Sequence, residues 1–147
     1  MTVSQFGTAY SLSGPKNAPV VVLIHGVGVT RHLWREYQQT LSDRYRVLSY
    51  DLLGHGESSR PQKTLSLSMF AEQLLTLINE LHIDRFAAVG FSMGGMINRR
   101  FTMDYPERIS ALVIMNSPHK RSIEAQKIVE ERVRKTAIGG PSVTIET

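Results

Sequence analysis

The chain has 147 residues, of which 41% are hydrophobic and 20% charged, with a net charge of +4 and no cysteine. This length and composition predict one globular domain and exclude a disulfide scaffold, a cysteine-ligated zinc site, a disordered chain and a collagen-like chain. No apolar run reaches the ~20 residues of a membrane span and MTVSQFG does not resemble a signal peptide, so we expect a cytoplasmic protein without a membrane partner.

Short apolar runs alternate with longer amphipathic segments, which is typical of strands alternating with helices in a parallel sheet. The run Val20–Ile24 contains no polar residue, as expected of a strand that is buried on both faces. The other predicted strands are Thr8–Leu12, Val47–Tyr50, Phe86–Val89 and Ala111–Met115. The sequence therefore predicts an α/β fold.

Two helices are predicted between these strands. Apolar residues at helical spacing indicate one over residues 67–81, with Thr64 or Ser66 as its N-cap. The other covers residues 93–104 and ends before Pro106, because proline disfavours a helical residue ahead of it.

A third predicted helix carries most of the net charge. Its spaced apolar residues run from Ala125 to Ala137, and Gly139-Gly140-Pro141 ends it. Residues 119–135 hold six basic and three acidic side chains, which supply three of the four net positive charges. A solvated helix face explains them, because no aromatic residues interleave as they do in single-strand binders. We therefore expect no nucleic-acid partner.

The strongest local motif is GFSMG at residues 90–94, directly after a predicted strand and before a predicted helix. A nucleophile elbow needs this tight turn, in which small residues two positions before and after the serine let neighbouring backbones pass. The helix N-terminus also directs its N–H groups and positive dipole at the site. The flanking strand and helix favour Ser92 as a catalytic nucleophile over a glycine-rich turn with an incidental serine.

A second motif, HGVG at residues 25–28, follows the first buried strand. An acyl-transfer site needs two backbone N–H donors aimed at the developing oxyanion. We expect the N–H groups of Val27 and Met93 to form this oxyanion hole, with Gly26 and Gly28 lining the pocket. His25 is interpreted as a packing histidine that braces the loop by hydrogen bonds, rather than as a catalytic base.

A third motif, DLLGHGES at residues 51–58, follows the next predicted strand. Asp51 and His55 precede the serine, whereas the acid and base of this arrangement follow it. We therefore interpret the segment as a structural turn.

These motifs, together with YPERISALVIMNSP at residues 105–118, resemble the α/β-hydrolase fold superfamily in order and spacing. The pattern is most similar to small-substrate esterases and lactonases, in particular the 3-oxoadipate enol-lactonase-like group. This resemblance implies a mostly parallel sheet flanked by helices and a serine hydrolase of a small ester or lactone, without cofactor or metal. A serine at position 92 disfavours epoxide hydrolases and haloalkane dehalogenases, which have aspartate there. Lactonase, carboxylesterase, carbon–carbon bond hydrolase and cofactor-free haloperoxidase stay open.

The resemblance also implies an N-terminal fragment, truncated after the sixth strand and inside the cap. Residues 1–118 would form the N-terminal part of the hydrolase core and residues 119–147 the start of the helical cap. Members of the superfamily carry their catalytic acid and histidine on loops well beyond the serine. Here the only histidine after Ser92 is His119, which we expect to line the pocket, and no carboxylate ends the strand at 111–115. We therefore expect this chain to be inactive.

The alternative function is that of a non-catalytic fragment or module that binds a small ligand or a partner. The predicted strand at 111–115 would expose a hydrophobic edge, which favours self-association through that edge.

Overall fold

The computed structural model describes residues 2–139 of the chain. Six strands form one sheet: β1 (Thr2–Val3), β2 (Ala9–Ser13), β3 (Val20–Ile24), β4 (Arg46–Tyr50), β5 (Phe86–Phe91) and β6 (Ile109–Met115). Their order across the sheet is β1-β2-β4-β3-β5-β6. The pairs β1–β2 and β2–β4 are antiparallel, and the remaining pairs are parallel. The predicted mostly parallel α/β sheet is confirmed.

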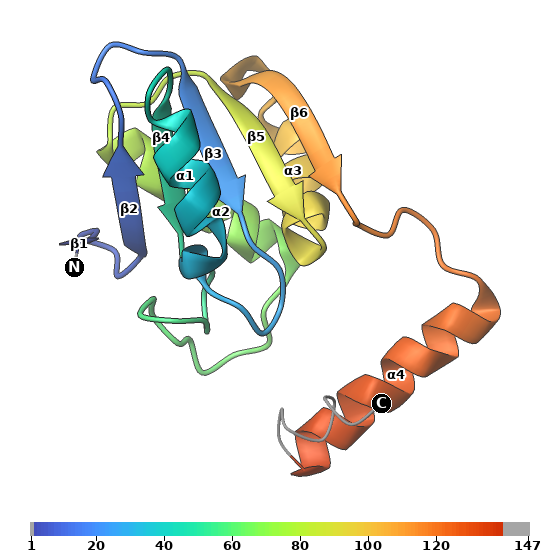
Figure 1. Ribbon diagram of the computed structural model, residues 1–147. Helices are drawn as coiled ribbons and strands as arrows, with labels where there is room; N and C mark the ends of the chain where they lie inside the picture. The colour runs from blue at the N-terminus through green and yellow to red at the C-terminus, as the bar shows by residue number, and fades with distance from the viewer. Residues whose placement is uncertain (1, 140–147) are drawn as a thin grey trace. The chain divides into compact units, whose positions relative to one another are not determined.

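Helices cover both faces of this sheet (Figure 1). A 3₁₀ turn, η1 (Arg31–Trp34), leads into α1 (Arg35–Leu41), which lies on one face. The helices α2 (Leu67–Glu80) and α3 (Met93–Asp104) lie on the other, and a second 3₁₀ turn, η2 (Pro106–Arg108), precedes β6.

The residues of β3 alternate between two apolar clusters, because successive side chains of a strand point to opposite faces. Val22 and Ile24 pack into the larger cluster with buried side chains of α2 and α3. Val21 and Leu23 pack into the smaller cluster with Trp34. A strand without polar residues is therefore required at this central position, as the sequence pattern predicts.

The predicted elements match the structure closely, with shifts of one or two residues at several ends and two elements missed. Of the two N-cap candidates for helix α2, the structure selects Ser66, whose hydroxyl accepts a hydrogen bond from the N–H of Met69 at 3.3 Å. The strand β1 and the helix α1 are absent from the sequence prediction. Strand β1 has only two residues, and α1 has no buried residue, so neither produces a periodic apolar pattern.

The strand β6 forms one edge of the sheet, since it pairs only with β5 among the described strands. Its side chains are exposed from Ser110 to Ile114, and Val113 is 46% exposed. This matches the exposed hydrophobic edge that the sequence predicts. Self-association of the chain through this edge stays a prediction.

The residues divide into two compact units with the boundary between Ser117 and Pro118. The second unit contains α4 (Ile123–Gly139), whose start is capped by the hydroxyl of Ser122, an acceptor for the N–H of Ala125 at 3.1 Å. The helix reaches Gly139, where the sequence predicts its end, while Gly140 and Pro141 lie outside the described residues. The assignment of residues 119–147 to a cap stays a prediction. No helix within residues 2–139 has the length and apolar character needed to cross a membrane.

Candidate active site

Ser92 lies between the end of β5 and the start of α3, in a sterically strained backbone conformation. Its φ is 55° and its ψ is −118°, a region that residues other than glycine rarely adopt. Two hydrogen bonds hold this turn: the N–H of Ser92 donates to the carbonyl of Met115 at 2.9 Å, and the N–H of Gly95 donates to the carbonyl of Ser92 at 3.0 Å. The turn therefore has the sharp strand-to-helix geometry of a nucleophile elbow.

The glycines on either side of Ser92 are required by close backbone contacts. A Cβ atom on Gly90 would lie 2.3 Å from the carbonyl oxygen of Gly94. A Cβ atom on Gly94 would lie 2.1 Å from the carbonyl oxygen of Ile24, in the neighbouring strand β3. Both distances are well below van der Waals contact, so the spacing G-x-S-x-G follows from the packing of this turn.

The loop after β3 passes directly beside Ser92. A Cβ atom on Gly26 would lie 3.0 Å from the Cβ of Ser92, so a side chain at this position would crowd the serine. Val27 follows with a side chain that is 68% exposed, and Gly28 has a positive φ of 77° with open space around it. Within residues 2–139, neither the N–H of Val27 nor that of Met93 donates a hydrogen bond. Both groups thus keep the capacity to bind an oxyanion.

His25 braces this loop, as the sequence interpretation predicts. Its imidazole is fully buried, its Nδ1 lies 2.7 Å from the carbonyl oxygen of Gly26, and its Nε2 accepts a hydrogen bond from the N–H of Leu52 at 3.0 Å. Burial lowers the pKa of His25. A buried ring with both nitrogens engaged is not available to take a proton from Ser92.

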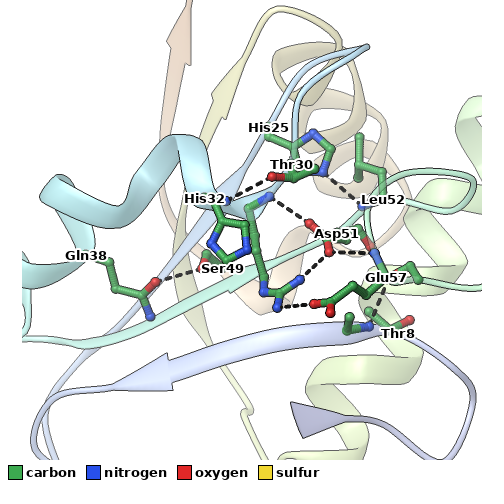
Figure 2. A network of polar contacts seen from close by, with 12 residues as sticks. Thr8, His25, Thr30, His32, Gln38, Ser49, Asp51, Leu52 and Glu57 are labelled. Atoms are coloured by element: carbon green, nitrogen blue, oxygen red, sulfur yellow. Dashed lines mark hydrogen bonds and ion pairs between the residues drawn. The ribbon is translucent and has the colours of Figure 1, made fainter. Parts of the chain in front are cut away.

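Asp51 organises the turn after β4, and Figure 2 shows it among the loops that meet there. One carboxylate oxygen accepts the backbone N–H of Arg31 at 2.7 Å, and the other accepts the Arg31 guanidinium and the N–H of Glu57, the latter at 3.0 Å. Arg31 also pairs with the carboxylate of Glu57 at 2.5 Å. A Cβ atom on Gly56 would lie 2.2 Å from the Asp51 carboxylate. The interpretation of this segment as a structural turn is confirmed.

The segment after β6 lies against the start of α3, a contact that the sequence analysis did not predict. Asn116 has a positive φ of 45°, and a Cβ atom on Gly95 would lie 2.6 Å from the hydroxyl oxygen of Ser117. Ser117 also accepts a hydrogen bond from Arg99 at 3.3 Å. The second glycine of GFSMGG is the only sequence signal for this contact.

The first unit therefore supplies five of the expected site residues, and His119 belongs to the second unit. Those five are Ser92, Gly26, Val27, Gly28 and Met93. No group of three or more potential metal-ligating His, Cys, Asp or Glu side chains occurs in the described part of the chain.

Comparison with known proteins identifies a matching family model, "alpha/beta hydrolase fold", over residues 19–137. A putative carbamate hydrolase, RutD, from Klebsiella pneumoniae is 38% identical over 110 residues, which are 71% of this chain and 41% of that protein.

Two solved structures are similar over 95% of this chain. The enol-lactonase from Burkholderia xenovorans superposes with a TM-score of 0.86 at 26% identity, over 54% of its chain. A thermophilic esterase from Thermogutta terrifontis superposes with a TM-score of 0.85 at 27% identity, over 51% of its chain. The chain thus spans about half the length of these proteins, or less.

Proposed function

This chain belongs to the alpha/beta hydrolase fold family, and on that premise we propose that Ser92 is the nucleophile of a serine hydrolase acting on a small ester or lactone. One observation carries the proposal: Ser92 occupies a strained turn at the N-terminus of α3, between two glycines at which an added Cβ atom would overlap neighbouring backbone atoms. Strain of this kind is retained where function requires a fixed geometry.

In the proposed reaction, the hydroxyl oxygen of Ser92 attacks the substrate carbonyl carbon and forms a tetrahedral intermediate. The N–H groups of Val27 and Met93 donate hydrogen bonds to its oxyanion, and the N-terminus of α3 stabilises the same negative charge. The proton that the hydroxyl of Ser92 loses passes to the leaving oxygen, so an alcohol is expelled and an acyl group stays on Ser92. Water then cleaves this acyl-serine ester, which releases the acid and restores the hydroxyl of Ser92.

The relatives support this class of substrate. Their names refer to a carbamate, an enol-lactone and an ester. In each, the reacting carbon is a carbonyl with an oxygen or nitrogen leaving group, so acyl transfer is the common chemistry. We propose a small ester or lactone because the enol-lactonase and the thermophilic esterase, which are each similar over 95% of this chain, are named for such compounds.

The nucleophile needs a base, because an unassisted hydroxyl is a weak nucleophile at neutral pH. His25 is buried with both nitrogens engaged, and the Nδ1 of His55 lies 3.1 Å from the carbonyl oxygen of Leu53. Loss of a triad base lowers turnover on the order of 10⁶-fold. We therefore propose that the 147-residue chain by itself turns over little substrate.

An external base tests the proposal on the chain as it is. We expect imidazole, added with p-nitrophenyl acetate, to promote acetylation of Ser92, which mass spectrometry of the quenched protein locates on the peptide containing residues 90–95. The Ser92→Ala variant is the matched control and should carry no acetyl group on that peptide. Acetylation at equal levels in both proteins, or none in either, would contradict the assignment of Ser92 as a nucleophile.

A second candidate function is that of a non-catalytic binding module. The observation that favours it is the edge strand β6, in which Leu112, Val113 and Ile114 are 38–46% exposed and no residue is charged or proline. An uncharged edge of this kind readily pairs with another strand. A second copy of β6 is the proposed occupant, because antiparallel pairing of identical edges about a twofold axis gives a closed dimer.

Size-exclusion chromatography of the chain over a range of concentrations tests this second function. Edge pairing predicts a dimer that dissociates on dilution and is lost in Val113→Lys, because a charge on an edge strand opposes pairing. Met103→Lys is the matched control, because it adds the same charge at a side chain that is 80% exposed and lies outside the sheet. This variant should form the dimer as the unchanged chain does. A monomer at all concentrations would refute edge pairing.

A further inference from the structure

The imidazole of His25 connects two loops that follow neighbouring strands. It lies at the end of β3, next to the loop that carries Val27, and its Nε2 is 3.0 Å from the backbone nitrogen of Leu52, in the loop after β4. Figure 2 shows His25 joined to Leu52 by this bond. This hydrogen bond links the start of the proposed oxyanion loop to the loop after β4.

The two hydrogen bonds of His25 fix its protonation state. A backbone N–H can only donate, so the Nε2 that bonds to Leu52 must carry a lone pair and no proton. The proton of the neutral ring is then on Nδ1, which donates to the carbonyl of Gly26 at 2.7 Å. A doubly protonated ring would direct an N–H group at the N–H of Leu52, so protonation and this hydrogen bond exclude one another.

The surroundings keep the ring neutral at neutral pH. Burial lowers the pKa of His25, the hydrogen bond to Gly26 raises it, the charge of His55 lowers it and the carboxylate of Asp51 raises it, with a net shift below the ordinary value of 6.5. The ring of His55 approaches at 5.4 Å between centroids. Asp51 is itself paired with the buried guanidinium of Arg31.

We propose that His25 is a positioning residue, whose neutral imidazole holds the loop of residues 25–28 on Leu52 and releases it when the ring is protonated. The backbone at Gly26 passes directly beside Ser92, where a Cβ atom would lie 3.0 Å from the serine Cβ. Release of this loop displaces the N–H of Val27 from Ser92. The proposal rests on the proposed function, since the Val27 N–H matters only as an oxyanion donor.

Nuclear magnetic resonance of the 147-residue chain tests the proposal without any catalytic assay. At pH 7.5, ¹⁵N spectra of the imidazole are expected to show the Nδ1–H tautomer for His25. As the pH falls below 6.5, we expect the hydrogen-exchange protection of the Leu52 amide to drop about tenfold, which corresponds to one lost hydrogen bond. The amide shift of Val27 should change with the same midpoint as the His25 ring, while the Val22 amide, in the centre of β3, keeps its protection.

Two variants complete the design. In His25→Gln, the amide oxygen can accept the Leu52 N–H but does not titrate, so the Leu52 and Val27 signals should become independent of pH. His82→Asn replaces an exposed histidine and should leave the wild-type behaviour unchanged. If His25→Gln fails to fold, the wild-type chain still tests the proposal, because the signals of His25, Leu52 and Val27 must then change with one common midpoint.

Three results would overturn the proposal: an Nε2–H tautomer at pH 7.5, a Leu52 protection factor that does not follow the His25 titration, or a Val27 amide that does not respond to it. The last result would leave His25 as a structural residue only. Ser92→Ala should leave all these signals unchanged. A failure of Ser92 to become acetylated would therefore contradict the proposed function while leaving the titration of His25 as it is.

Discussion

The carboxylate of Asp51 is completely buried and forms an ion pair with Arg31, whose side chain is only 7% exposed. This pair joins the turn after β4 to the start of η1, because Asp51 also accepts the backbone N–H of Arg31. The loop of the proposed oxyanion hole lies between His25 and Arg31, so it is attached to the segment after β4 at both of its ends.

Substitution of Asp51 by Asn leaves the buried guanidinium of Arg31 without its main counter-charge. We expect Asp51→Asn to lower the free energy of unfolding by about 3 kcal/mol, the cost of breaking a buried ion pair by removal of one partner. Urea unfolding, monitored by circular dichroism, measures this change in the free energy of unfolding. Asp104→Asn is the matched control, because its pair with Arg100 is largely exposed and contributes about 0.2–1 kcal/mol. Equal effects of the two substitutions would contradict this account of Asp51.

The sheet and the turn at Ser92 are predictable from the sequence, because each is marked by a continuous run of residues. The apolar run of β3 and the G-x-S-x-G spacing around Ser92 can both be recognised without knowledge of the tertiary contacts that require them. The polar network is not predictable, since Arg31 contacts a carboxylate 20 residues away and no periodic pattern marks it. Helix α1 escapes prediction for a related reason: the side-chain amide of Gln38, which holds it against β4, donates to the carbonyl of Val47 at 3.2 Å, and no periodic pattern marks this contact.

The hydroxyl group of Tyr50 is buried and has no hydrogen-bond partner within the described residues. Burial raises the pKa of Tyr50, so the phenol is neutral. A buried polar group without a partner costs about 1–3 kcal/mol of desolvation, so we expect Tyr50→Phe to raise the free energy of unfolding by about 1 kcal/mol. Thermal unfolding should show an increased Tm, with Tyr37→Phe, at an exposed position, as the neutral control. A decrease in Tm would indicate that the hydroxyl has a partner.

The contact between Gly94 and β3 determines how closely α3 approaches the sheet. A methyl group on Gly94 would lie 2.1 Å from the carbonyl oxygen of Ile24, so the backbone of α3 or of β3 would have to shift. We expect Gly94→Ala to lower the free energy of unfolding by about 3 kcal/mol, at the upper end of overpacking effects. Met103→Ala, at an exposed position of the same helix, should change it by less than about 0.5 kcal/mol. A small effect of Gly94→Ala in urea unfolding would show that α3 can move away from the sheet.

The rate of p-nitrophenyl acetate hydrolysis without added imidazole tests whether the chain contains its own base. The N–H groups of Val27 and Met93 remain in Ser92→Ala, so any stabilisation of the oxyanion is shared by both proteins. We therefore expect the wild-type chain and Ser92→Ala to agree within about twofold, because only an activated serine would separate them. A wild-type rate far above that of the variant would show that a group in this chain activates Ser92. His119, the only histidine after Ser92, is then the first residue to substitute, and His119→Gln should abolish the difference if it is the base.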